Sequence, residues 1–138
     1  MKTLAFLFIG VAILGGFLLF SRSDYLPRKQ SEFRKIAEPV AERAITSLVA
    51  KTVSSLSAQE QSLLTPIASL IAGYRTVTRA GNLAVYRYQL LADAQVSESI
   101  LFGVPLDFDG TKKTIHLRVD HLVSGPQLAQ VFIDESGR

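Results

Sequence analysis

The sequence predicts an α+β fold in which an N-terminal transmembrane helix precedes two helices packed on one face of a four- to five-stranded antiparallel meander sheet. Three observations predict it. An uncharged apolar run opens the chain, apolar residues then recur at helical spacing as far as Gly73, and beyond that point they alternate with polar residues. The 138 residues therefore divide into a predicted transmembrane signal-anchor over residues 1–21, a basic juxtamembrane linker over residues 22–31 and a single α+β domain over residues 32–138.

The predicted anchor carries no charge from Thr3 to Ser21. At a rise of about 1.5 Å per residue, a helix of that length spans close to the ~30 Å hydrocarbon layer of a bilayer. A cleaved secretory signal is the alternative, but only Ser21-Arg22-Ser23 approximates the small-residue cleavage pattern. The run therefore favours a single-pass membrane protein that contacts lipid through residues 3–21.

Two rules disagree about the orientation in the membrane. Basic residues concentrate after the apolar run, which favours a cytoplasmic domain under the positive-inside rule. A very short N-terminal tail with one lysine is typical of an export signal-anchor, which leaves the following domain outside. We favour the periplasmic or extracytoplasmic side.

The positive net charge of +3 comes from the stem that follows the anchor. Residues Arg22 to Lys51 include seven basic and four acidic residues, whereas Thr52 to Arg138 include seven basic and eight acidic residues. This distribution speaks against nucleic-acid binding and favours contact with lipid headgroups, although a merely solvated stem is an equal alternative. The predicted headgroup contacts are Arg22, Arg28, Lys29, Arg34 and Lys35.

Two helices are predicted after the linker. Apolar residues at three- and four-residue steps indicate a first helix from Glu32 to Leu56, in which Pro39 must cause a kink or lie in the first turn. Ser57-Ala58-Gln59-Glu60 is a capping box that opens a second helix, and Gly73 ends it. Pro66 is expected to shorten or bend this second helix.

The strands are predicted from alternation and turn signals. A first strand over residues 74–80 precedes a Gly81-Asn82 turn, and a long alternating run over residues 83–96 places Tyr86 and Tyr88 on one apolar face. The next turn is expected at Ser97–Ser99.

The remaining strands are also predicted from alternation and turn signals. Residues 100–108 form a strand that Pro105 places at an edge or a bend, and Asp109-Gly110 turns the chain into a strand that includes residues 115–120. Gly125-Pro126 precedes the last strand. The order of these elements resembles the cystatin-like and NTF2-like modules, in which a sheet curls around an N-terminal helix, and the resemblance implies a fold without implying a function.

No catalytic, cofactor or metal site is predicted. The chain has no cysteine, and His116 and His121 lie five residues apart on one strand, which places them on opposite faces as ordinary solvated residues. Asp107-Phe108-Asp109-Gly110 lacks the further oxygen ligands of a calcium loop, so a hairpin turn accounts for it better.

The sequence favours a non-catalytic accessory or scaffold protein that binds a protein partner in a membrane complex. The face of the sheet opposite the helices is the predicted docking face, and it would carry Arg87, Gln89, Leu101, His116, Arg118 and Asp120. The alternative is an anchored domain that binds a small molecule or lipid, or hydrolyses it, in a pocket lined by Tyr86, Tyr88, Phe102 and Phe108.

Overall fold

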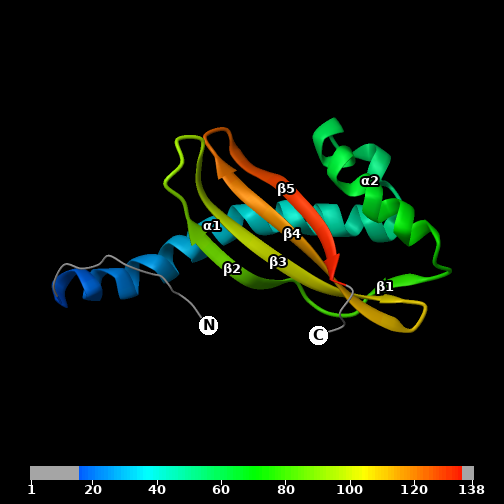
Figure 1. The fold of residues 1–138 in the computed structure, drawn as a ribbon, viewed down its shortest axis with the longest axis horizontal. Helices are drawn as coiled ribbons and strands as arrows, with labels where there is room; N and C mark the ends of the chain where they lie inside the picture. Colours follow the sequence, from blue (N-terminus) through cyan, green and yellow to red (C-terminus); the bar gives the residue numbers. More distant parts are fainter. Residues whose placement is uncertain (1–15, 135–138) are drawn as a thin grey trace. The chain divides into compact units, whose positions relative to one another are not determined.

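A computed structural model describes residues 16–134, with side chains from Pro27 onward. It has the predicted α+β fold, with two helices packed on one antiparallel sheet (Figure 1). The chain divides into two compact units, residues 1–33 and residues 34–138. Most of the predicted anchor, residues 3–15, lies outside the described residues. Within residues 16–134, no helix combines the length and the apolar character that a membrane span needs.

Helix α1 (Gly16–Ala50) is longer than predicted. It includes residues 22–31, which were expected to form a linker, and it passes through Pro39 without ending. Arg, Lys, Gln and Glu predominate just after Pro27, and these residues favour helix. Pro39 is exposed, and packing of the opposite side of the helix through Ala37 and Ala41 offsets the hydrogen bond that this proline lacks.

The C-terminal end of α1 comes earlier than the predicted Leu56. Lys51 has a φ of 61°, its N–H bonds the Leu48 carbonyl at 3.3 Å, and the Thr52 N–H bonds the Ser47 carbonyl at 2.9 Å. This pair of bonds is a Schellman motif, which normally places glycine at the left-handed position. A short 3-10 helix, η1 (Val53–Ser55), follows.

Helix α2 (Ala58–Ala72) confirms the predicted capping box. The Ser57 hydroxyl accepts a hydrogen bond from the Glu60 N–H at 3.3 Å and donates one to the Glu60 carboxylate at 3.3 Å. The helix continues through Pro66, so the predicted shortening does not occur. Glu60 is buried and also pairs with Arg43 of α1 at 2.8 Å, so the same carboxylate caps α2 and attaches it to α1.

Five antiparallel strands form one sheet: β1 (Val77–Arg79), β2 (Ala84–Leu90), β3 (Val96–Phe108), β4 (Thr111–Leu122) and β5 (Gly125–Asp134). Strands β2 to β5 make the predicted meander, and β1 shares one edge of β3 with β2. Pro105 therefore lies in a strand with neighbours on both sides and not at a sheet edge. It occupies the gap between β1 and β2, where its carbonyl accepts a hydrogen bond from the Ala80 N–H.

Two features of the β2–β3 hairpin differ from the prediction. The connection lies at residues 91–95 and not at Ser97–Ser99, because the Asp93 carboxylate accepts hydrogen bonds from the backbone N–H groups of Gln95 and Val96. A β-bulge between Val85 and Arg87 also breaks the alternation. Tyr86 and Tyr88 consequently do not share a face of the sheet.

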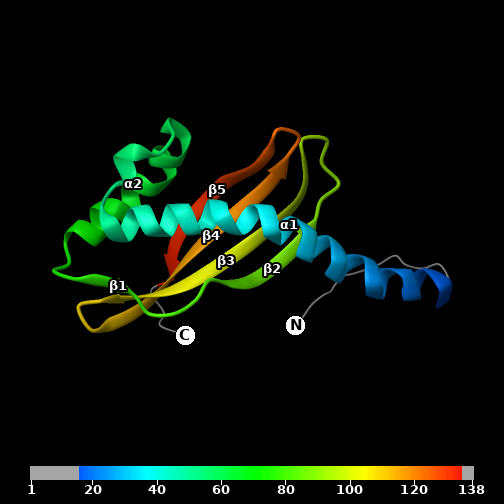
Figure 2. The ribbon, with the colours of Figure 1, turned by 180° about the vertical axis from the view of Figure 1, so that it is seen from behind.

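The core lies between α1 and one face of the sheet, called here the inner face, and Figure 2 shows α1 lying across it. Ala37, Ala41 and Ala44 of α1 are at most 2% exposed, and such small side chains let the helix approach the strands closely. The fully buried inner-face residues of β3 and β4 are Ile100, Phe102, Val104, Leu106, Phe108, Ile115, Leu117 and Val119. The opposite side of the sheet is called the outer face.

The β3–β4 hairpin turns at Asp109-Gly110 as predicted, with both residues at positive φ. The Asp109 carboxylate accepts hydrogen bonds from the backbone N–H of Arg75 at 3.0 Å, and from the backbone N–H and hydroxyl of Thr76 at 2.7 and 3.0 Å. These bonds, led by the one from the Thr76 N–H, hold the pKa of Asp109 below its ordinary value. The hairpin is thereby attached to the segment that joins α2 to β1.

Stability at acid pH should depend on Asp109. Because its pKa is lower in the folded state, its carboxylate stabilises the fold above the unfolded pKa, and this contribution is lost as the pH falls through the folded pKa. The unfolding free energy should therefore decrease below about pH 4. Asp109→Asn retains the tolerance of positive φ and removes the charge, so its unfolding free energy should vary less with pH there. Urea titrations of both full chains in mild detergent, from pH 7 to pH 3, test this, and parallel pH profiles would contradict it.

Candidate functional site

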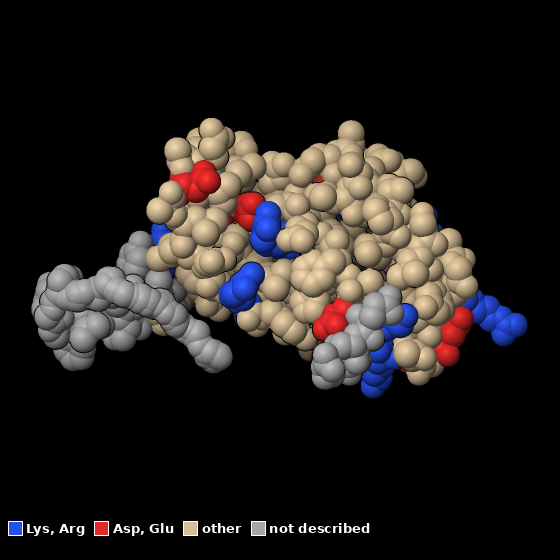
Figure 3. All heavy atoms as spheres, in the orientation of Figure 1, with Lys and Arg blue, Asp and Glu red and all other residues tan. Residues whose placement is uncertain are grey.

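The strand register brings all six predicted docking residues onto the outer face. They lie in three neighbouring cross-strand rows, and the first row crosses Gly103, His116 and Phe132. The second row crosses Arg87, Leu101, Arg118 and Gln130, and the third crosses Gln89, Ser99, Asp120 and Gln127. In Figure 3 this side of the molecule is mostly uncharged, with a few basic and acidic groups near the middle.

An aromatic cluster lies at the centre of the outer face. The His116 ring stacks on Phe132 with centroids 4.9 Å apart, and Tyr86 meets His116 edge-on at 4.7 Å. The bulge in β2 brings Tyr86 to this side, and Gly103 leaves room for it, since a Cβ there would lie 2.5 Å from the Tyr86 ring. Tyr86 is 55% exposed and Phe132 is 38% exposed, so two aromatic side chains present apolar surface to the outside.

His116 is buried beneath these two rings, contrary to the expectation of a solvated residue. Its Nδ1 atom is inaccessible and has no hydrogen-bond partner among the described residues. Burial lowers the pKa of His116, and the nearby charge of Asp134 opposes that shift in part. A neutral imidazole between two rings therefore adds to the apolar centre of the face.

Charged groups surround the aromatic cluster. Arg118 bonds Asp120 at 3.1 Å and Gln130 at 3.2 Å, so its guanidinium is already engaged. Arg87 is exposed and makes no ion pair with any of the described side chains. The outer face thus offers an apolar centre beside one arginine whose charge is not neutralised.

A second polar cluster lies on the inner face, and sequence reasoning did not single it out. Glu98 is 3% exposed; its carboxylate accepts a hydrogen bond from the Tyr88 hydroxyl at 2.6 Å and bonds His121 Nδ1 at 2.6 Å. Glu98 was predicted to lie in a turn at Ser97–Ser99 and was therefore missed. Extending the alternation of the following strand back from Ile100 would have placed the Glu98 side chain on the inner face. His116 and His121 lie on opposite faces, as predicted.

The residues predicted to contact lipid headgroups differ in their exposure and in their pairing. The side chain of Arg22 lies outside the described residues, Arg28 and Lys35 are exposed, and Lys29 is half-buried. Arg34 pairs with Glu38 at 3.2 Å on the surface of α1. These positions leave the lipid-contact prediction untested.

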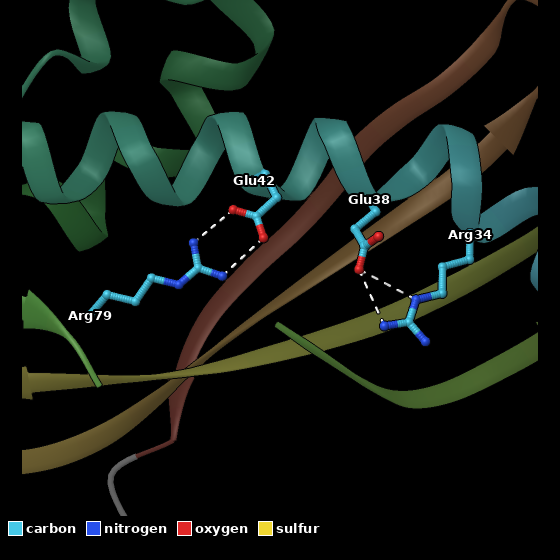
Figure 4. A network of polar contacts seen from close by, with 4 residues as sticks. All are labelled: Arg34, Glu38, Glu42 and Arg79. Carbon is cyan, nitrogen blue, oxygen red and sulfur yellow. Dashed lines mark hydrogen bonds and ion pairs between the residues drawn. The ribbon is translucent and has the colours of Figure 1, made fainter. Parts of the chain in front are cut away.

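An open depression of about 540 Å³ lies beside Arg34 and Lys35. Arg34 and Glu38 line it, and so do Glu42 and Arg79, whose ion pair joins α1 to β1 through two bonds of 2.7 and 2.9 Å (Figure 4). The hydrogen bond from Arg79 is the main cause of the lowered pKa of Glu42. Four of the five charged residues that line the depression are thus neutralised in pairs, and Lys35 is the fifth.

The aromatic residues of the alternative pocket prediction do not line a common pocket. Phe102 and Phe108 are at most 1% exposed in the core, and Tyr86 lies on the other face of the sheet. Tyr88 bonds the buried Glu98. Across the described residues, no group of three or more His, Asp or Glu side chains could hold a metal ion.

No protein-family model matches the chain, and no curated protein or solved structure matches it either. The cystatin-like and NTF2-like element order therefore stays a resemblance.

Replacing Glu98 should destabilise the fold. In Glu98→Gln the amide keeps one acceptor for Tyr88 but presents N–H groups to His121, so a buried charge-assisted bond is lost at a cost of about 1.5–3 kcal/mol. The matched control is Glu38→Gln, which breaks an exposed helix ion pair and should cost about 0.5 kcal/mol or less. Denaturant titration of the full chains measures both, and equal midpoints for Glu98→Gln and the native chain would contradict the assignment.

Proposed function

We propose that this chain is a non-catalytic, membrane-anchored accessory protein that binds a protein partner through the outer face of its sheet. The observation that carries the proposal is the aromatic cluster of Tyr86, His116 and Phe132, in which the Tyr86 and Phe132 rings are exposed. Aromatic and arginine side chains contribute most of the binding free energy in many protein interfaces. Each aromatic side chain can bury roughly 150–250 Å² of surface.

The charges of the face define the chemistry of the partner. Arg118 is engaged by Asp120, whereas Arg87 has no acidic partner among the described residues. A complementary surface would place an apolar side chain over Tyr86 and Phe132 and a carboxylate beside Arg87. Such a carboxylate would fix the register of the complex as well as adding to its affinity.

The membrane part of the proposal rests on the sequence. The uncharged run from Thr3 to Ser21 is long enough to cross a bilayer, and basic residues follow it. We place the protein in the membrane as a single-pass chain, with residues 34–138 on the periplasmic or extracytoplasmic side. Binding of one partner at a membrane then defines an accessory or scaffold function.

Arg87→Glu and Tyr86→Ser should each release the partner. Arg87 is exposed and makes no ion pair with the described side chains, so Arg87→Glu should alter folding by no more than about 0.5 kcal/mol. Tyr86→Ser also removes the ring contact with His116 and should cost about 0.5–1.5 kcal/mol, so the folded fraction of this variant is measured alongside binding. The loss of an interface contact of this kind weakens binding by roughly tenfold or more. The partner is isolated with the full chain from its native membrane in mild detergent at moderate salt, and its ratio to the chain is measured.

The matched control is Arg75→Glu, an exposed arginine in the connection between α2 and β1. A photo-crosslinker at Gln89 on the outer face should capture the same partner, and one at Thr65 on α2 should not. Equal recovery of the partner with Arg87→Glu, Tyr86→Ser and the native chain would contradict the proposal. So would a crosslink at Thr65 alone.

A further inference from the structure

Two neighbouring loops expose apolar side chains at one end of the sheet. Leu90 ends β2 and Leu91 begins the β2–β3 connection, and their exposed fractions are 42% and 36%; Val123, in the β4–β5 turn, is 93% exposed. Figures 1 and 2 both show these two connections side by side, and Val96 pairs with Leu122 between them. We call Leu90, Leu91 and Val123 the apolar tip.

The conformations of the two connections do not explain why apolar residues occupy these exposed positions. The turn at Val123 and Ser124 has its positive φ at Gly125, and a β-branched residue has no conformational advantage in such a connection. In the other loop the Asp93 carboxylate and a bond from the Leu91 N–H to the Ser97 carbonyl shape the backbone, and the side chain of Leu91 contributes to neither. Neither burial nor local geometry explains the apolar tip.

The apolar tip lies at the end of the sheet toward which α1 begins within residues 34–138. Glu42 binds Arg79 of β1, which pairs with Leu106 of β3, and Figure 4 shows Glu38 and then Arg34 following Glu42 along α1 in the direction away from Arg79. Passing back along α1 from Glu42 to Arg34 thus leads from the Phe108 end of β3 toward its Val96 end. The Asp109-Gly110 hairpin, followed by the charged Lys112, lies at the other end of the sheet.

We propose that the apolar tip inserts into the interfacial layer of a lipid bilayer. This inference rests on the proposed membrane attachment, because residues 22–33 alone separate the uncharged run from Arg34, a distance of about 20 Å in helical form. A unit on so short a tether stays close to the bilayer surface. Leucine and valine side chains at that surface gain from leaving water, as the apolar faces of interfacial helices do.

Single-cysteine variants test this directly, since the chain has no cysteine of its own. The variants Leu91→Cys and Val123→Cys report on the tip, Lys112→Cys reports on the opposite end of the sheet, and Ala12→Cys reports on the predicted anchor. Each full chain is labelled with an environment-sensitive fluorophore and reconstituted into phosphatidylcholine vesicles, with and without spin-labelled lipid as a quencher.

The labels at Leu91 and Val123 should shift to shorter wavelength and be quenched by the spin-labelled lipid, whereas the label at Lys112 should show neither effect. Quenching at Ala12 with none at Leu91 and Val123 would overturn the inference and leave the proposed anchor intact. Quenching at the tip with none at Ala12 would support the tip and overturn the anchor. The absence of quenching at all four positions would overturn both.

Discussion

The close packing of α1 on one face of the sheet is the constraint on which the rest of the structure depends. Ala37, Ala41 and Ala44 bring the helix near to strands whose inward residues are fully buried. A second helix, α2, is then attached to α1 through Arg43 and Glu60 and to β5 through a hydrogen bond from Gln59 to the Leu128 carbonyl. The outer face is left without a covering element from residues 34–134, so its aromatic cluster and Arg87 stay available for a partner.

The two faces give similar residues different roles. His121, on the covered side, is held by the buried carboxylate of Glu98, which Tyr88 also bonds. His116, on the other side, is buried by the two aromatic rings that flank it, and no side chain or backbone group in the described part of the chain bonds its Nδ1. The first arrangement satisfies a buried acid and stabilises the core, whereas the second makes an apolar surface from residues that sequence alone would class as polar or partly polar.

Regular elements with strong local signals were predictable from the sequence. The Ser57 capping box, the Asp109-Gly110 turn and the alternation in β3 and β4 each depend on neighbouring residues, and all three are confirmed. The docking residues lie together because four of the six come from those regular strands. Two features without a local sequence signal were missed. They are the bulge that moves Tyr86 to the outer face, and the positive φ of a non-glycine residue, Lys51, where α1 ends.

In the membrane, the proposed protein partner covers the outer face of the sheet. Side-chain footprinting with a reactive carbene tests it most directly, because it reports exposure residue by residue. In native membranes Tyr86 and Phe132 should be protected, and they should become reactive once the chain is purified alone. Tyr74, which packs on Phe108 away from this face, serves as the internal reference. Equal reactivity of Tyr86 and Phe132 in the two preparations would contradict the account.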